Sequence, residues 1–192
     1  MSKIIAIAGF SGSGKSTSLR FLPPEQTFII NANSKQLSIP GFRKNYIPLH
    51  IEAVKDEDGK PVMVKKKDGT QVQKKAYVGN YFQGYDYEKV FKILKVIPTF
   101  KNLKYVVFED INYMLGQDTM SMAMTPSRDK YSMFAFNYNE LLTRLMNLPD
   151  NLYVIITTHL MSDDLGNGNS LIKVISNSSN SACRTANSVS VR

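Results

Sequence analysis

A glycine-rich stretch near the start of the chain carries the clearest chemistry in the sequence. Residues 9–17 read Gly-Phe-Ser-Gly-Ser-Gly-Lys-Ser-Thr and match the phosphate-binding pattern G-x-x-x-x-G-K-[ST]. Glycines in such a loop let backbone N–H groups turn inward around phosphate oxygens, because no Cβ blocks the approach. Lys15 can reach the β- and γ-phosphates of a nucleotide, and the Ser16 hydroxyl is placed to bind Mg²⁺. The predicted phosphate-binding residues are Gly9, Phe10, Ser11, Gly12, Ser13, Gly14, Lys15, Ser16 and Thr17.

The segments on either side of this loop are those that a phosphate-binding loop needs. Residues 3–8 form a short apolar, β-branched run, which predicts a buried parallel strand. Residues 16–22 continue as a short helical pattern that Pro23 and Pro24 end. The alternative is a glycine-rich turn between a strand and a helix that binds no ligand.

Two acids end a second apolar strand, predicted at residues 103–110. In a doubly wound sheet the carboxyl ends of the strands line the ligand crevice, so Glu109 and Asp110 are expected to face the loop. One carboxylate can hold Mg²⁺, and the other can orient or deprotonate an attacking water. The order Glu109 then Asp110 leaves the division of these roles open. The alternative is an acidic pair that only caps the strand in solvent.

A further buried strand, predicted at residues 151–159, also ends in polar side chains. Thr158 or His159 would lie beside the γ-phosphate and hydrogen-bond differently to a triphosphate and a diphosphate. A purely structural histidine is the alternative. A strand predicted at residues 27–31 ends near Asn31 and Asn33, where many RecA-like ATPases carry an acid.

Size and composition predict one soluble globular domain, and the cysteine count favours the cytoplasm. The 192 residues are enough for one domain with a real core, and no apolar run reaches the roughly 20 residues of a membrane helix. We expect no signal peptide, because the first apolar run leads directly into the loop. The single cysteine, Cys183, excludes an internal disulfide and fits a reducing compartment. The net charge of +8 favours a polyanionic partner.

Residues 42–83 differ from the rest, because two Asp-Gly pairs separate short alternating segments. This pattern predicts a β-hairpin or a three-stranded meander inserted into the α/β core. The segment carries Lys55, Lys60, Lys65, Lys66, Lys67, Lys74 and Lys75. One interpretation is a basic surface that follows single-stranded DNA or contacts a partner protein. The other is a solvated hairpin whose lysines prevent edge-to-edge pairing.

The remaining segments read as packing elements and a tail. Helical stripes at residues 85–96 and 131–148 predict core helices, and Asp86 is placed to cap the first. Residues 171–175 predict a last short strand within a domain of residues 1–175. The Ser- and Asn-rich residues 176–192 lack the apolar content to order themselves, so we expect a loose tail.

Four motifs follow one another along the chain: the loop at residues 9–17, the strand end at 108–110, the segment at 128–134 and the strand end at 156–159. This order resembles the small RecA-like P-loop ATPases encoded by tailed bacteriophages, including those associated with single-strand annealing. The resemblance covers residues 1–175. It implies a sheet in which the strand ending at His159 lies between the loop strand and the acidic strand. It also implies ATP hydrolysis with Mg²⁺, self-assembly, and a role in phage DNA recombination or replication in the host cytoplasm.

The sequence therefore predicts an ATPase in which Lys15, Glu109, Asp110 and His159 are catalytic. Ser16 and an acid of the Glu109–Asp110 pair are expected to hold Mg²⁺. Two alternatives stay open: a small-molecule kinase, such as a nucleotide kinase, and a nucleotide-binding structural, virion or packaging component with little turnover. Kinases of this kind usually carry clustered arginines over the phosphates, and this chain has no such cluster.

Overall fold

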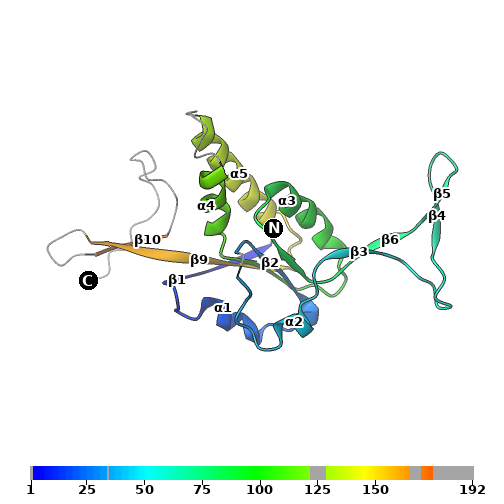
Figure 1. The fold of residues 1–192 in the computed structure, drawn as a ribbon, viewed down its shortest axis with the longest axis horizontal. Coiled ribbons are helices and arrows are strands. Elements are labelled where there is room, and N and C mark those ends of the chain that lie inside the picture. Colours follow the sequence, from blue (N-terminus) through cyan, green and yellow to red (C-terminus); the bar gives the residue numbers. More distant parts are fainter. Residues whose placement is uncertain (1, 34, 122–128, 165–169, 175–192) are drawn as a thin grey trace.

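The computed structural model describes residues 2–33, 35–121, 129–164 and 170–174 (Figure 1). The predicted tail at residues 176–192, which includes Cys183, lies outside the described residues. Among the helices that are described, none combines the length and apolarity needed to cross a membrane.

The body is an α/β unit built on a sheet of five parallel strands in the order β1-β9-β8-β2-β7. These strands are β1 (Lys3–Gly9), β2 (Thr27–Asn31), β7 (Tyr81–Gln83), β8 (Tyr105–Glu109) and β9 (Tyr153–Asp164). A sixth strand, β10 (Ser170–Val174), pairs antiparallel with the far end of β9. Because β9 lies between β1 and β8, three strand ends that the sequence singles out meet at one edge of the sheet.

Helices flank both faces of this sheet (Figure 1). One face carries α3 (Tyr87–Val96), α4 (Asn112–Ser121) and α5 (Asp129–Met146), and the other carries α1 (Lys15–Ser18) and α2 (Phe42–Asn45). Short 3₁₀ turns follow at Leu19–Phe21, Pro24–Gln26 and Ile97–Thr99. The predicted cap of α3 is confirmed, because the Asp86 side chain accepts a hydrogen bond from the Lys89 N–H.

The alternation of side chains along β2 divides the core into two layers. Phe28 and Ile30 pack with α3 and α5 on one face of the sheet, whereas Ile29 packs with Leu19 and Phe42 on the other. Every residue of β2 is buried, as a central parallel strand requires. The prediction for this strand is therefore confirmed in both its bounds and its burial.

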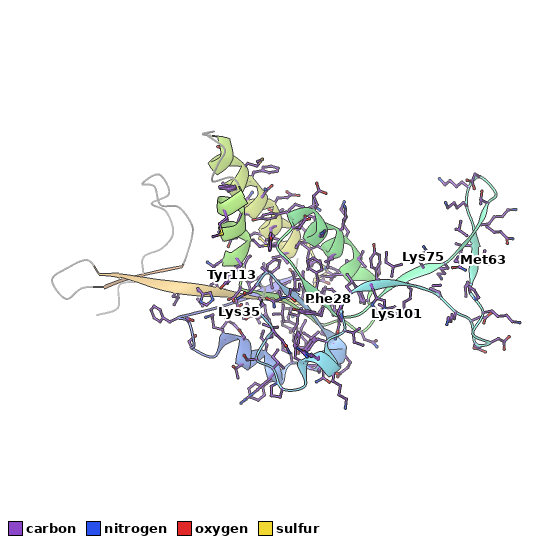
Figure 2. All side chains as sticks on the ribbon, viewed as in Figure 1. Phe28, Lys35, Met63, Lys75, Lys101 and Tyr113 are labelled. Atoms are coloured by element: carbon purple, nitrogen blue, oxygen red, sulfur yellow. The ribbon has the colours of Figure 1, made fainter. Side chains whose placement is uncertain are left out.

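The inserted segment is one long projection, which we call the arm (residues 50–78; Figure 1). Its base is the antiparallel pair β3 (His50–Ala53) with β6 (Lys75–Val78), and its tip is the pair β4 (Met63–Lys65) with β5 (Gln71–Gln73). The two ladders form nested hairpins, so the meander is wrong. The segment 79–83, included in the predicted insertion, instead contains β7 of the main sheet. Figure 2 shows Met63 and Lys75 on the arm, far from Phe28 in the core.

Two strands, β1 and β9, differ from their prediction. The sequence predicts that β1 is buried, but it is an edge strand, and most of its residues are exposed. Apolar residues on both faces do not distinguish a central strand from an edge strand, because the neighbouring strands come from distant parts of the chain. The prediction also ends β9 at His159, whereas the strand continues to Asp164 beside β10.

Candidate functional site

The glycine-rich loop joins the end of β1 to the start of α1, as its sequence predicts. Gly12 and Gly14 have φ values of 78° and 88°, a left-handed conformation that favours glycine. At Gly9 a Cβ would lie 2.5 Å from the Ser13 Oγ, so a larger residue would displace the Ser13 side chain. Residues 10–14 are mostly exposed, which leaves their backbone on the surface of the sheet edge.

Lys15 is buried, and its ammonium group lies inside the loop. The Nζ donates to the carbonyl oxygens of Gly9 at 2.9 Å and Phe10 at 3.0 Å. It also lies 3.4 Å from the Nδ1 of His159, across the pairing between β1 and β9. The cation is therefore held at the centre of the strand ends rather than in solvent.

Glu109 is fully buried at the end of β8 and binds the loop directly. The Ser16 hydroxyl donates to its Oε1, and the Thr157 hydroxyl donates to its Oε2 at 2.7 Å. Burial raises the pKa of this carboxyl, and the neighbouring Asp110 carboxylate adds to the increase. The hydrogen bonds from Ser16 and Thr157 and the charge of Lys15 act in the opposite direction.

Asp110 follows directly and has a different set of partners. Its φ of 55° is the left-handed conformation that aspartate tolerates better than most residues, and it turns the chain from β8 toward α4. Its N–H donates to the Thr157 hydroxyl at 2.7 Å, and its Oδ2 accepts from the Asn33 amide at 3.1 Å. Its Oδ1 lies 2.9 Å from the Nε2 of His159.

The part of β9 beside the loop, at Thr158 and His159, is held in place by the first residue of α4. The Oδ1 of Asn112 accepts from the Thr158 hydroxyl at 2.5 Å and from the His159 N–H at 3.1 Å. These two bonds fix the backbone of His159, and its ring then reaches Lys15 on one side and Asp110 on the other. The ring therefore links the loop to the acidic pair.

The structure brings Lys15, Ser16, Glu109, Asp110 and His159 together, although they lie as many as 144 positions apart along the chain. Sequence reasoning did not single out three further members as partners of this cluster: Asn33, Thr157 and Asn112. Asn33 and Asn112 are polar residues just beyond the carboxyl ends of β2 and β8, and that position is the signal that could have found them, whereas Thr157 lies within β9.

The donor set at this edge fits Mg²⁺. Ser16 and Glu109 supply oxygen atoms already in contact, and Mg²⁺ is usually held by one or two carboxylates together with substrate phosphates and water. Within the residues that the structure describes, no group of three or more His, Cys, Asp or Glu side chains forms a protein-only metal cage. A site completed by a phosphate ligand needs no such cage.

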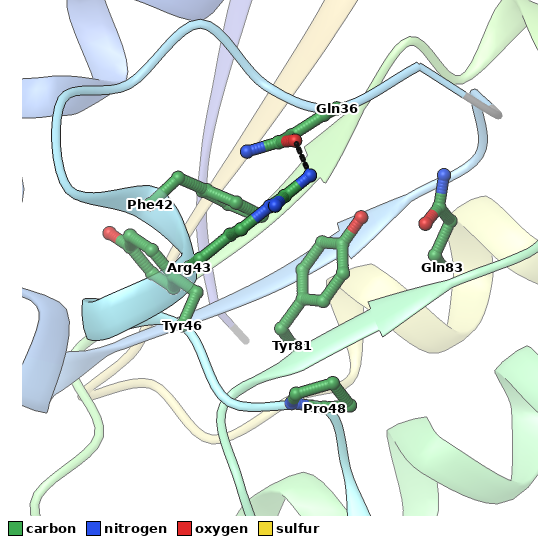
Figure 3. Close-up of a pocket in the computed structure, with 7 residues that line it drawn as sticks. All are labelled: Gln36, Phe42, Arg43, Tyr46, Pro48, Tyr81 and Gln83. Atoms are coloured by element: carbon green, nitrogen blue, oxygen red, sulfur yellow. Dashed lines mark hydrogen bonds between the residues drawn. The ribbon is translucent and has the colours of Figure 1, made fainter.

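A pocket lies beside β7, the strand at the other end of the strand order from β1 (Figure 3). It is a pocket of about 310 Å³ lined by Gln36, Phe42, Arg43, Tyr46, Pro48, Tyr81 and Gln83. Arg43 donates to the Gln36 side chain at 3.2 Å across its rim. None of the predicted site residues lines this pocket, but Gln83 on its wall donates to the carbonyl oxygen of Asn33 at 3.1 Å, and the Asn33 side chain holds Asp110.

No protein-family model matches the chain, and no curated protein matches it. The class that the structure defines is an α/β protein with a five-stranded parallel sheet flanked by helices, compatible with a Rossmann-like or P-loop fold.

Proposed function

We propose that this protein is a Mg²⁺-dependent ATPase of the P-loop class with a RecA-like sheet. The observation that carries the proposal is the contact between the Ser16 hydroxyl and the buried carboxylate of Glu109. A solvated acidic cap would stay in water, whereas this acid is desolvated against the loop that precedes it by 93 residues. The position of β9 between β1 and β8 supports the additional-strand arrangement that the family resemblance implies.

In this proposal ATP binds with its phosphates against the backbone of residues 10–14. Lys15 exchanges its bonds to the Gly9 and Phe10 carbonyls for bonds to β- and γ-phosphate oxygens. Preorganised donors of this kind stabilise the charge that develops on the transferred phosphoryl group.

Ser16 and Glu109 are the residues that would hold Mg²⁺. Bound there, the ion would supply positive charge to the β- and γ-phosphate oxygens. Thr157 bonds to the second oxygen of Glu109 and so fixes the carboxylate plane toward Ser16. Of the two acids, Glu109 is therefore the one that we assign to the metal.

Asp110 is then the residue that orients or deprotonates the attacking water. Asn33 and the backbone bond to Thr157 hold it, so its second oxygen is directed toward His159. His159 lies between this carboxylate and Lys15, at 2.9 Å and 3.4 Å. A change at the γ-phosphate that moves Lys15 would therefore alter the contact between its Nζ and the His159 ring.

The family resemblance makes phage DNA recombination or replication in the host cytoplasm the process that we propose. Single-stranded DNA is the proposed partner of the arm, because all seven of its lysines are exposed on a projection that leaves the body. Five acids on the arm, Glu52, Asp56, Glu57, Asp58 and Asp68, make that surface mixed rather than uniformly basic.

Steady-state ATP hydrolysis with and without single-stranded DNA tests the function. We expect Mg²⁺-dependent turnover that DNA stimulates, and a loss of about 10²–10³-fold in kcat for Lys15→Ala. Lys66→Ala on the arm is the matched control and should keep the DNA-independent rate. Turnover only with a phosphate acceptor would indicate a small-molecule kinase. Binding of ATP without turnover would indicate a nucleotide-binding component, and either result would refute the ATPase.

A further inference from the structure

The pocket beside β7 has an aromatic wall of fixed shape (Figure 3). Phe42 stacks on Tyr46 with 5.1 Å between ring centroids, and it meets the Tyr81 ring edge-on at 4.9 Å. All three rings are buried, so the packing of the body holds them in place. The volume of about 310 Å³ is at the lower end of the range for sites that bind small molecules.

The opening of the pocket carries a cation that no acid neutralises. None of the lining residues is an acid, and residues 27–48, which supply most of them, contain three cations and no Asp or Glu. The Arg43 guanidinium donates to the neutral Gln36 side chain, and no carboxylate among the described residues forms an ion pair with it. Glu25 lies near Tyr46, where its charge adds to burial in raising the pKa of the hydroxyl. Arg43 is therefore the group that an entering anion would meet.

Two hydrogen-bonded connections join this pocket to the carboxylate of Asp110. The Gln83 side chain donates to the Asn33 carbonyl oxygen at 3.1 Å, and the Asn33 amide donates to the Asp110 Oδ2 at 3.1 Å. The Tyr81 hydroxyl accepts from the Asn31 side chain at 3.3 Å, and the Asn31 Oδ1 accepts from the Asn33 N–H at 2.9 Å. Because Asn31 and Asn33 are buried, the position of Asn33 depends on both residues that β7 gives to the pocket.

We propose that this pocket binds a nucleotide through its base and one phosphate, and that the bound nucleotide changes the position of Asp110 through Asn33. An aromatic wall suits a planar base, and the carboxamides of Gln36 and Gln83 can exchange hydrogen bonds with a base edge. The planar fork of Arg43 matches the geometry of a phosphate. A free mononucleotide and a nucleotide within a single strand offer this same chemistry.

This nucleotide is a second one beside the ATP whose phosphates the glycine-rich loop binds. Four strand spacings, about 19 Å, separate β1 from β7 in the sheet. A base that bonds to the Gln83 amide or the Tyr81 hydroxyl competes with their bonds to Asn33 and Asn31, and so shifts the residue that holds Asp110. This effect on Asp110 rests on the proposed function and should appear in kcat, whereas binding in the pocket stands without it.

Equilibrium dialysis of deoxynucleoside monophosphates against the full chain carrying Lys15→Ala tests binding, because this background disables the loop site. We expect Arg43→Gln to weaken binding about tenfold or more, since it removes charge-assisted hydrogen bonds. Lys44→Gln removes the same charge from an exposed neighbour that does not line the pocket, and should change binding much less. Equal weakening by the two variants would indicate unspecific attraction and overturn the site.

A labelled single-stranded octanucleotide in the same assay distinguishes the two sources of the nucleotide. Binding of the monophosphates that depends on Arg43 supports a free nucleotide. Dependence on Arg43 for the octanucleotide alone supports a nucleotide within a strand. Binding of both probes that is independent of Arg43, or no binding of either, would overturn the site.

Steady-state ATP hydrolysis by the chain with Lys15 intact, with and without the probe that binds, tests the connection to Asp110. We expect a saturating probe to change kcat about fivefold with little change in KM for ATP. Gln83→Leu keeps the size of the side chain but cannot donate to Asn33, so it should remove most of this response. Gln36→Leu is the matched control on the opposite wall and should keep it.

The two assays fail in distinguishable ways. A response of kcat that survives Gln83→Leu, or a bound probe that leaves kcat unchanged, would overturn the connection to Asp110. A chain that hydrolyses no ATP but binds the probe through Arg43 would refute the ATPase and support the nucleotide site. Circular dichroism shows whether each variant is folded.

Discussion

The carboxyl edge of the sheet and the arm use charged side chains in opposite ways. At the sheet edge Lys15, Glu109 and Asp110 are buried, and each one contacts two or more neighbours from other elements. On the arm the lysines are exposed and the strands pair only with each other, without a buried apolar layer. Burial fixes the position of a charged side chain, and at Glu109 it also raises the pKa of the carboxyl, whereas exposure leaves a charge free to meet a partner.

The largest contrast is expected from matched changes of one carboxylate in each region. Asp110→Asn should lower kcat by about 10²-fold or more with little change in ATP affinity, since it removes the group that we propose acts on water. Asp58→Asn, on the arm, should leave kcat unchanged. Steady-state kinetics and equilibrium nucleotide binding measure both values. Full activity of Asp110→Asn would contradict the role assigned to this residue.

Truncating a buried apolar side chain of the sheet body should lower the free energy of unfolding much more than truncating one on the arm. Leu141 on α5 is fully buried in the core, so Leu141→Ala should lower the free energy of unfolding by about 2–5 kcal/mol. Val64→Ala at the arm tip should change it by no more than about 0.5 kcal/mol. Urea unfolding followed by circular dichroism measures both. A large decrease at Val64 would mean that the arm packs on something beyond its own ladder.

The pH dependence of stability should report the buried carboxyl of Glu109. Its pKa is raised in the folded state, so folding favours the protonated form. Its contribution to stability is therefore complete below the ordinary value of 4.5 and is lost as the pH rises through the raised pKa. Glu109→Gln should remove this loss and increase stability at neutral pH relative to the unaltered protein. Unfolding curves across this pH range, with Glu57→Gln on the arm as control, measure it.

The smallest effect is expected from arm lysines. Replacing Lys65, Lys66 and Lys67 by alanine should weaken single-stranded DNA binding and lower the slope of log K against log salt by about 0.7 for each phosphate that the protein no longer neutralises. Hydrolysis without DNA should not change. Replacing Lys92, Lys95 and Lys101, which are exposed on the body, is the control. Equal slopes for the two triple variants would exclude the arm as the DNA-binding surface.

Much of the α/β body could be predicted from the chain, because its strands are short apolar runs bounded by turn residues. The bounds of β2 agree with the prediction, and α3 begins at its predicted cap. The edge position of β1 could not be predicted, because strand order depends on contacts between segments distant along the chain. The arm was predicted as hairpin structure from its Asp-Gly turns, but its division into two ladders depends on a register that turn residues alone do not set.

The sequence by itself determined the chemical groups of the candidate site: a loop with glycines at left-handed positions, one lysine, one serine, and polar residues at strand ends. Spacing within a few residues is enough to predict these groups, because it fixes which backbone and side-chain atoms the loop can offer to a phosphate. Only the tertiary structure decided that Glu109 meets Ser16 while Asp110 meets Asn33 and His159. That division follows from the left-handed turn at Asp110 and the position of β9 between β1 and β8, which no local pattern encodes.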